Sequence, residues 1–363
     1  MGEKSFFCLI LQAEKMKLHI FNPEHDIALA SNLSNFTAPH AGRKMRHDLG
    51  YLPALWADGG YVLVENVDDA RKAYSRLMHR SYDRFVDKSM LAGLDIDSVS
   101  PWGWDLALRS FLIRYGVGSV PSVDEIAEIR ELSHRKYAVM LLRELEMDGT
   151  TGLSFMTDQI DAVRQAVEDY GRIVVKAPWS SSGRGVRFFD GDINENQESW
   201  VRNVISLQQN VVVERYCNKV KDFGMEFESD GEGRVSYLGL SLFDTKNGAY
   251  TGNILASESE KIEMISHYIS VDKLDAVKEK ICSCLGPLYK GRYKGPLGVD
   301  LMIVRGDGCA GFLLNPCVEI NLRRTMGHVA LELSRLCLSG SVMRIDFSDS
   351  TYRLHVSTPC RNQ

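Results

Sequence analysis

The sequence contains no long hydrophobic run and no strong excess of either charge. Across its 363 residues, no apolar stretch is long enough to span a bilayer. The formal net charge of -5 gives no basic footprint for nucleic acid or for an anionic membrane. The hydrophobic share of 44% and the charged share of 25% are ordinary for a soluble globular chain. We therefore expect a globular protein with no nucleic-acid partner and no membrane partner.

Signature motifs of several enzyme classes are missing as well. The eight cysteines are scattered, without the paired C-x-x-C units of a zinc site, which favours free thiols in a reducing cytoplasm. No GxGxxG motif is present, so a nicotinamide-binding Rossmann domain is not expected, and no G-K-[ST] ends a loop as in a Walker A motif. The sequence also shows no nucleophile elbow and no Cys/His signature, which is consistent with chemistry that needs no nucleophilic serine or cysteine.

The first fifteen residues include a short apolar run, residues 6–11, which follows Lys4 like the core of a signal peptide. The run is brief, however, and no small-residue cleavage site follows it. Met16 begins MKLHIF, which reads directly into a strand. We expect the folded protein to begin near Met16.

The strongest chemical pattern is a predicted β-hairpin over residues 298–321. Residues 298–304 are apolar apart from Asp300, a Gly-rich turn follows, and the return strand alternates apolar and polar residues. Glu319 and Asn321 are two residues apart, so they point to the same face of a strand, and Asp300 can lie near them on the other arm. Two carboxylates and an amide oxygen suit Mg²⁺. Arg323 continues the same face, where it could hold a phosphate.

The alternative is a solvated hairpin whose charged side faces water. The flanks of this segment are strongly apolar, however, so the hairpin is expected inside a domain. Carboxylates in such a place need a partner or a metal ion, because burying an unpaired charge is costly.

A second pattern lies in RIVVKAPWSSSGRGVRFF, residues 172–189. An apolar strand ends in Lys176, a Ser/Gly loop follows, and a second strand begins at Val186. Such a loop lets backbone N–H groups and hydroxyls approach phosphate oxygens, and a lysine adds a point charge. The alternative is a hairpin with a mobile tip. The candidate phosphate contacts are Lys176, Ser181, Ser182, Gly183 and Gly185.

Residues 16–115 alternate short apolar strands with helical segments. This βαβ rhythm implies a parallel sheet. A polar segment follows the first strand, at the place where open αβ sheets commonly contact ligands. Its His25 and Asp26 are a candidate general-base pair, although adjacent residues seldom orient one another. The basic residues between Arg43 and His47 suit an acidic substrate, with a solvated helix face as the alternative.

The hairpin pattern D-x-apolar, turn, E-I-N-x-R resembles the metal-binding hairpin of the ATP-grasp superfamily, and the lysine and Ser/Gly loop resemble that family's phosphate loop. The resemblance covers roughly the last two-thirds of the chain. It implies an α/β chain with two α+β nucleotide-binding lobes, residues 116–207 and 208–345. It also implies that the preceding parallel-sheet domain, residues 16–115, helps to bind substrate.

The resemblance also implies roles for individual residues. Lys136, or Arg135 as the runner-up, begins a helix and would reach the nucleotide phosphates. Glu226, with Asp222 as the alternative, would hold the ribose hydroxyls. Lys246 lies on a polar loop that covers the acceptor site in related ligases, although a solvated lysine is equally plausible. The adenine contacts would come from Glu214 and from the main chain of Arg215 and Tyr216.

The implied activity is that of an ATP-dependent ligase. It would join a small-molecule carboxylate to an amine, or less often a thiol, through an acyl phosphate, with Arg323 and Lys246 assisting catalysis. ATP and Mg²⁺ are the implied cofactors, with Mn²⁺ as a substitute, and relatives are often homodimers. Two alternatives stay open: an ATP-grasp phosphotransferase acting on a small-molecule hydroxyl, and a nucleotide-binding protein without catalysis.

Overall fold

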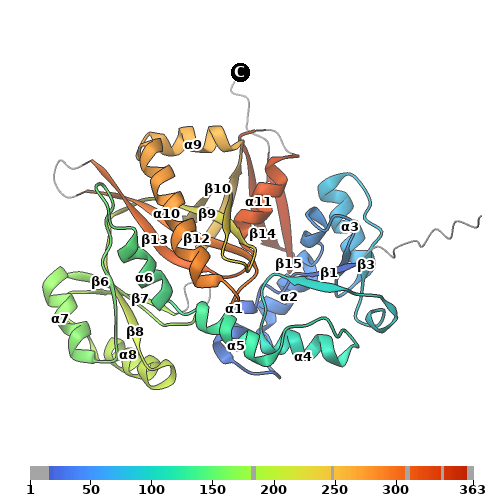
Figure 1. Cartoon of the computed structure of the whole chain (residues 1–363), viewed down its shortest axis with the longest axis horizontal. Coiled ribbons are helices and arrows are strands. Elements are labelled where there is room, and N and C mark those ends of the chain that lie inside the picture. Colours follow the sequence, from blue (N-terminus) through green and yellow to red (C-terminus); the bar gives the residue numbers. More distant parts are fainter. Residues whose placement is uncertain (1–15, 181–184, 247–248, 307–310, 337–338, 358–363) are drawn as a thin grey trace, which may run out of the picture.

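The computed structural model describes residues 16–180, 185–246, 249–306, 311–336 and 339–357. These residues form three lobes, which are seen in Figure 1 as a blue N-terminal lobe, a green lobe and a yellow-to-red lobe between them. The green lobe and the yellow-to-red lobe keep the names that the sequence predicts for them, the first and the second nucleotide lobe. The mixed α/β class is confirmed. Within the described ranges, no helix is long and apolar enough to cross a membrane.

The N-terminal lobe is built on a four-stranded sheet in the order β3-β2-β1-β4, and every pairing in it is parallel. The parallel sheet predicted from the βαβ rhythm is therefore confirmed. Its strands are apolar because helices cover both faces, with Leu18 in one core cluster and Val62 in another. The elements are β1 (Lys17–Ile20), α1 (His25–Ser31), α2 (His40–Leu49), η1 (Leu52–Leu55), β2 (Tyr61–Leu63), α3 (Val67–Met78), β3 (Phe85–Val86), η2 (Leu91–Gly93), β4 (Ser98–Pro101) and α4 (Leu106–Arg114).

The first nucleotide lobe is an antiparallel sheet in the order β5-β8-β6-β7. One face carries Val175 and Val213 into a core with helices α7 and α8. Strand β8 is hydrogen-bonded to β5 and β6, so the sheet extends to Arg215, beyond the expected limit at residue 207. The elements are β5 (Ser154–Thr157), α7 (Ile160–Tyr170), β6 (Arg172–Lys176), β7 (Val186–Asp190), α8 (Glu195–Gln208) and β8 (Val211–Arg215).

The second nucleotide lobe is a seven-stranded sheet in the order β13-β12-β9-β10-β11-β14-β15. One face of its central strands buries Phe223, Leu240 and Val299 in the largest core cluster, together with apolar residues of α5, α6 and α10. The elements are α5 (Val123–Leu132), α6 (Lys136–Glu144), β9 (Lys219–Ser229), β10 (Val235–Lys246), β11 (Ala249–Leu255), α9 (Glu258–Ser266), α10 (Val271–Tyr289), β12 (Gly295–Arg305), β13 (Phe312–Asn321), α11 (Met326–Ser334), β14 (Ser341–Ser348) and β15 (Thr351–Ser357).

Two elements of this lobe extend further than the sequence suggests. Helix α10 continues to Tyr289 through Gly286 and Pro287, two residue types that usually end a helix. The helix packs tightly there, because a Cβ on Gly286 would lie 2.5 Å from the carbonyl oxygen of Gly233. The chain also extends its sheet past residue 345 with the β14–β15 hairpin, whose Met343 and Leu354 join a core of the N-terminal lobe. The two lobes are therefore fixed to one another.

Candidate nucleotide and metal site

The two nucleotide lobes face each other across Lys176 at the end of β6. Its Nζ lies 2.7 Å from Glu214 Oε2 on β8 and donates to the carbonyl oxygen of Val318 on β13 at 3.2 Å. Val174 and Glu214 are register partners, and Val175 packs into the core on the opposite face. Because successive side chains of a strand point to opposite faces of the sheet, Lys176 and Glu214 both point toward the second lobe.

The predicted metal hairpin forms, with Asp300 on β12 directly opposite Glu319 on β13. The neighbouring strand β9 places Gly224 beside Asp300. Burial, together with the nearby carboxylates of Glu319 and Glu226, raises the pKa of Asp300 to about 8. Such a shift means that the negative form of Asp300 needs a nearby cation to be stable at neutral pH.

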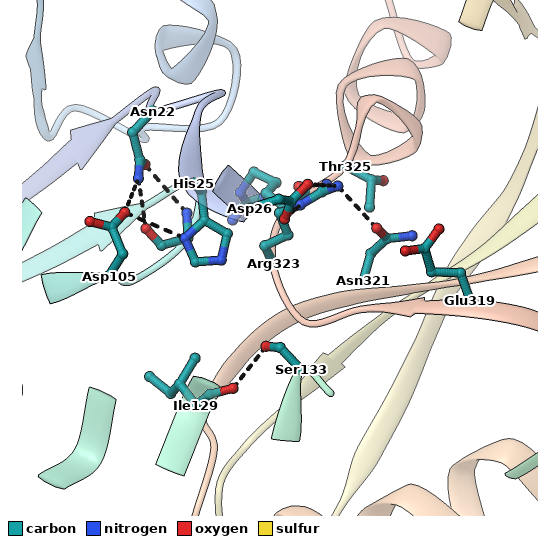
Figure 2. Close-up of polar contacts among 12 residues, drawn as sticks. Asn22, His25, Asp26, Asp105, Ile129, Ser133, Glu319, Asn321, Arg323 and Thr325 are labelled. Atoms are coloured by element: carbon teal, nitrogen blue, oxygen red, sulfur yellow. Dashed lines mark hydrogen bonds and ion pairs between the residues drawn. The ribbon is translucent and has the colours of Figure 1, made fainter. Parts of the chain in front are cut away.

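Asn321 and Arg323 lie next to this pair, and Arg323 is turned toward the N-terminal lobe. Asn321 Nδ2 donates to Asp300 Oδ2 at 3.0 Å, and Asn321 Oδ1 accepts from Arg323 at 3.0 Å. The Arg323 guanidinium makes two 2.7 Å hydrogen bonds to Asp26 at the start of α1, as Figure 2 shows. Arg323 is thus held by a carboxylate where the sequence suggested a phosphate contact.

The basic residue that joins the two motifs is Arg135, the runner-up, and not Lys136. Arg135 is buried, and its guanidinium donates to Glu319 Oε1 at 2.6 Å, to Ser180 Oγ at 2.8 Å and to the Ala177 carbonyl oxygen. Lys136 instead donates to Glu131 at the surface. The reason is geometric, because consecutive residues at a helix start point about 100° apart.

The structure describes the predicted adenine contacts at residues 214–216, here called the hinge, and part of the phosphate loop. The backbone N–H groups of Arg215 and Tyr216 donate to the carbonyl oxygens of Leu153 and Arg172. These N–H groups are therefore committed to the protein. Gly185 closes the base of the loop, since its carbonyl oxygen accepts from Ala177 N at 2.7 Å. Ser181, Ser182 and Gly183 lie outside the described residues.

Glu226 is enclosed by protein and does not lie at an accessible surface. Its side chain is 3% exposed and lies 3.0 Å from His328 Nδ1 on α11. A ribose hydroxyl could not reach it without opening this packing. Asp222, the alternative, is four residues nearer the hinge on the same face of β9, and it pairs with Lys219 at 2.6 Å. The side chain of Lys246 lies outside the described residues, although its backbone ends β10.

Sequence reasoning pointed to the polar segment that follows β1 but missed the contacts of Asp105 with His25 and Asn22. His25 and Asp105 are almost fully buried, with His25 Nδ1 3.5 Å from Asp105 Oδ2. Asn22 Nδ2 donates to Asp105 at 3.3 Å and to the Gly103 carbonyl oxygen at 2.8 Å (Figure 2). His25 therefore lies beside Asp105 at ion-pair distance without a hydrogen bond to it, while Asp26 turns away to Arg323. The expected pairing of His25 with Asp26 is wrong, because adjacent side chains on α1 diverge.

The hairpin fits a magnesium ion in part. Two carboxylates on facing strands, one with a raised pKa, are the hard oxygen donors that Mg²⁺ prefers. Among the described residues, however, no group of three or more acidic, histidine or cysteine side chains converges as a metal cage. The protein would thus supply a minority of the ligands, as is usual where water and nucleotide phosphates complete the shell.

Neither a protein-family model nor a curated protein matches the sequence. Solved structures match at low identity. Biotin carboxylase from Campylobacter jejuni, in complex with β-γ-ATP, has a TM-score of 0.53 at 13% identity, over 93% of this chain and 77% of that chain. The biotin carboxylase domain of Hydrogenobacter thermophilus 2-oxoglutarate carboxylase, with MgADP and bicarbonate, has a TM-score of 0.52 at 12% identity, over 92% and 75%. N5-carboxyaminoimidazole synthetase from Staphylococcus aureus, with ADP, has a TM-score of 0.48 at 14% identity, over 93% and 84%.

Identities this low establish a fold and leave the activity to be argued from the site. The first two structures match over more than nine-tenths of this chain, so the shared architecture includes the N-terminal lobe as well as both nucleotide lobes. The fold predicted from the hairpin and the lysine–loop motif is confirmed. This chain has the ATP-grasp fold.

Proposed function

We propose that the protein is an ATP-dependent ligase that joins a small-molecule carboxylate to an amine. The observation that carries this proposal is the position of Arg135. It touches both the base of the phosphate loop, at Ser180, and the candidate metal ligand Glu319. Two motifs that are far apart in the chain thus share one cation, as expected where a metal–triphosphate complex is bound between two lobes.

Each residue near the cleft then has a role in binding. Arg135 and Lys176 would hold the phosphates, because both are buried cations at the junction of the two lobes. Asp300 and Glu319 would hold Mg²⁺, or Mn²⁺ in its place, with the Asn321 amide as a further oxygen ligand if it rotates. Asp222 would contact the ribose, and Glu214 the adenine amino group.

In the proposed reaction, the main task of the protein is to position the reacting groups. Bound ATP supplies the γ-phosphoryl group, and Mg²⁺ neutralises charge on the phosphates. A substrate carboxylate attacks the γ-phosphate to give an acyl phosphate and ADP. The amine nitrogen then bonds to the acyl carbon, the bond from that carbon to the phosphate oxygen breaks, and phosphate leaves. The protein would act on small molecules in the cytoplasm, and light scattering would test whether it forms the expected homodimer.

The deciding experiment measures ADP release from Mg-ATP with pooled amino acids, small peptides and carboxylic acids, with and without hydroxylamine. A ligase forms a hydroxamate that depends on one pool. ADP release with a phosphorylated hydroxyl compound and no hydroxamate would instead identify a phosphotransferase. No ADP in any pool, with Mg-ATP binding intact, would support a binding protein.

Glu319→Gln is the test of the metal assignment. It keeps the size of the side chain and removes the charge, so we expect Mg-dependent ADP release to fall by at least about 100-fold. Glu168→Gln, which changes an exposed glutamate on α7, is the matched control. Near-normal rates in Glu319→Gln would remove Glu319 from the metal site.

A further inference from the structure

A cavity of about 500 Å³ lies in the N-terminal lobe, outside the carboxyl ends of its four parallel strands. It is lined by residues that follow each strand: Asn22 after β1, Glu65 after β2, Lys88 after β3 and Asp105 after β4. Open αβ sheets bind ligands in this crevice, at the point where the strand order reverses. The volume is that of a small-molecule site.

The exposed part of the cavity lining, its rim, carries three cations and one acid, Glu65, whereas the buried part, its inner end, carries two acids. Arg43, Lys88 and Arg114 are exposed side chains, and in the described part of the chain none of the three has an ion-pair partner. The two acids at the inner end, Glu24 and Asp105, are almost fully buried. This segregation of charge would orient a ligand, with its negative group at the rim and a hydrogen-bond donor or cation inside.

The Glu24 carboxylate can accept a further hydrogen bond. One of its oxygens is paired with Arg46, which also bonds Glu65, so the single positive charge of Arg46 is shared between two carboxylates. The other oxygen, Oε2, is buried and has no hydrogen-bond partner among the described residues. Burial raises the pKa of Glu24 against the opposing effect of Arg46. A ligand amine beside this carboxylate would compensate that cost.

The inner end of the cavity adjoins the candidate metal site. Asp105 lines the cavity, and its neighbour His25 lines a small hollow that also includes Arg135 and Glu319. The contacting side chains of His25 and Asp105 therefore lie between the two spaces. A group held at the inner end would face the place where the acyl phosphate of the proposed ligase forms, whereas a group at the rim would face away.

We propose that this cavity binds the amine substrate of the ligase, a small amino compound that carries a carboxylate or a phosphate at its far end. The rim cations Lys88, Arg114 and Arg43 hold the negative group, and Glu24 and Asp105 receive the amine. The carboxylate substrate does not fit this position, because the rim would hold its reacting group away from the phosphate loop. The role of the ligand as the amine substrate rests on the proposed ligase function, whereas its binding in the cavity does not.

Calorimetric titration of the full chain without nucleotide tests the proposal. The probes are O-phospho-L-serine, L-glutamate and 6-aminohexanoate, with L-serine and L-glutamine as comparators that lack the distal charge. We expect at least one charged probe to bind saturably, and its phosphate or carboxylate group identifies which anion the rim accepts. Lys88→Glu/Arg114→Glu should weaken that binding about tenfold or more, because two exposed contacts become repulsive. Lys72→Glu, on the outer face of α3, should leave it unchanged.

Binding and turnover separate the two proposals. A protein that binds a charged probe through Lys88 and Arg114 but releases no ADP keeps the cavity assignment and loses the ligase. A ligase whose amine KM is unchanged in the double variant loses the cavity assignment alone. The inference is also overturned if none of the three charged probes binds, or if they bind the double variant as tightly as the original protein. Glu24→Gln is a second variant, expected to weaken the amino probes more than succinate, which has no amine.

Discussion

Asp26 and Arg323 are joined by two hydrogen bonds of 2.7 Å although 297 residues separate them in the chain. Arg323 follows the metal hairpin, and Asp26 begins the first helix of the N-terminal lobe. Burial acts to raise the pKa of the Asp26 carboxyl, but Arg323 outweighs this effect and holds that pKa below its usual range. The pair therefore anchors the proposed substrate lobe to the candidate reaction centre.

Asp26→Asn should destabilise the protein and misplace Arg323. It leaves a half-buried guanidinium without its charged partner, so we expect a loss of about 2 kcal/mol in the free energy of unfolding. If the lobes must be held in register for catalysis, ADP release should fall while nucleotide affinity stays the same. Urea unfolding and a nucleotide titration measure the two effects.

The control for this pair is Asp68→Asn, which removes an exposed partner of Arg71 on α3 at 3.8 Å. That change should cost less than about 0.5 kcal/mol, because exposed pairs contribute little. Equal effects of Asp26→Asn and Asp68→Asn on unfolding would show that the Asp26–Arg323 pair is no anchor.

Local patterns predicted the parts of the site that lie within one supersecondary unit. The hairpin could be predicted because period-two alternation fixes both faces of a strand, and Asp300 indeed lies opposite Glu319. The contact of Asp26 with Arg323 has no local signal, since it depends on how two lobes pack. The choice between Arg135 and Lys136 could not be made from the sequence for a related reason. A helix start shows that one of the two reaches the cleft, but only the packed face of α6 decides which.

Substitutions of Lys176 and Lys136 compare a buried lysine at the junction of the two lobes with a lysine at the surface. Lys176→Met should weaken Mg-nucleotide binding by about tenfold to 100-fold, because it removes a buried positive charge that faces Glu214 and the second lobe. Lys136→Met should change the affinity less than about twofold, since its Nζ is held at the surface by Glu131. Titration with a fluorescent nucleotide analogue measures both. A larger loss in Lys136→Met would restore the assignment suggested by the sequence.

Gly327 at the start of α11 should not tolerate a side chain. An added Cβ would lie 1.8 Å from Glu226 Oε1 and 2.6 Å from Ser241 Oγ. Alanine normally stabilises a helix, but overpacking beside this carboxylate should destabilise Gly327→Ala by about 2 kcal/mol. Gly118→Ala is the control, because nothing lies within 4 Å of the position of its Cβ. Equal urea midpoints for the two variants would mean that Glu226 is free to move.

The stability of the protein should fall as the pH drops from about 6.5 toward 4. Burial lowers the pKa of His19 to about 4, helped by Lys17, and burial lowers that of His134 to about 4, helped by Lys136. Between those values and the usual pKa near 6.5, the unfolded chain binds protons that the folded chain does not. Stability therefore rises with pH across this window, by up to about 3 kcal/mol for each histidine.

Substitution of the two histidines separates their effect from that of the carboxyl groups. Burial raises the pKa of Asp300 and of Glu24, which gives a slope of opposite sign, so the diagnostic quantity is the change in slope between variants. Urea midpoints measured from pH 7 to pH 4.5 should depend less steeply on pH in His19→Gln/His134→Gln. The exposed His267, replaced by glutamine, should leave the slope unchanged. An unchanged slope in the double variant would mean that both imidazoles accept protons in the folded protein as readily as in the unfolded chain.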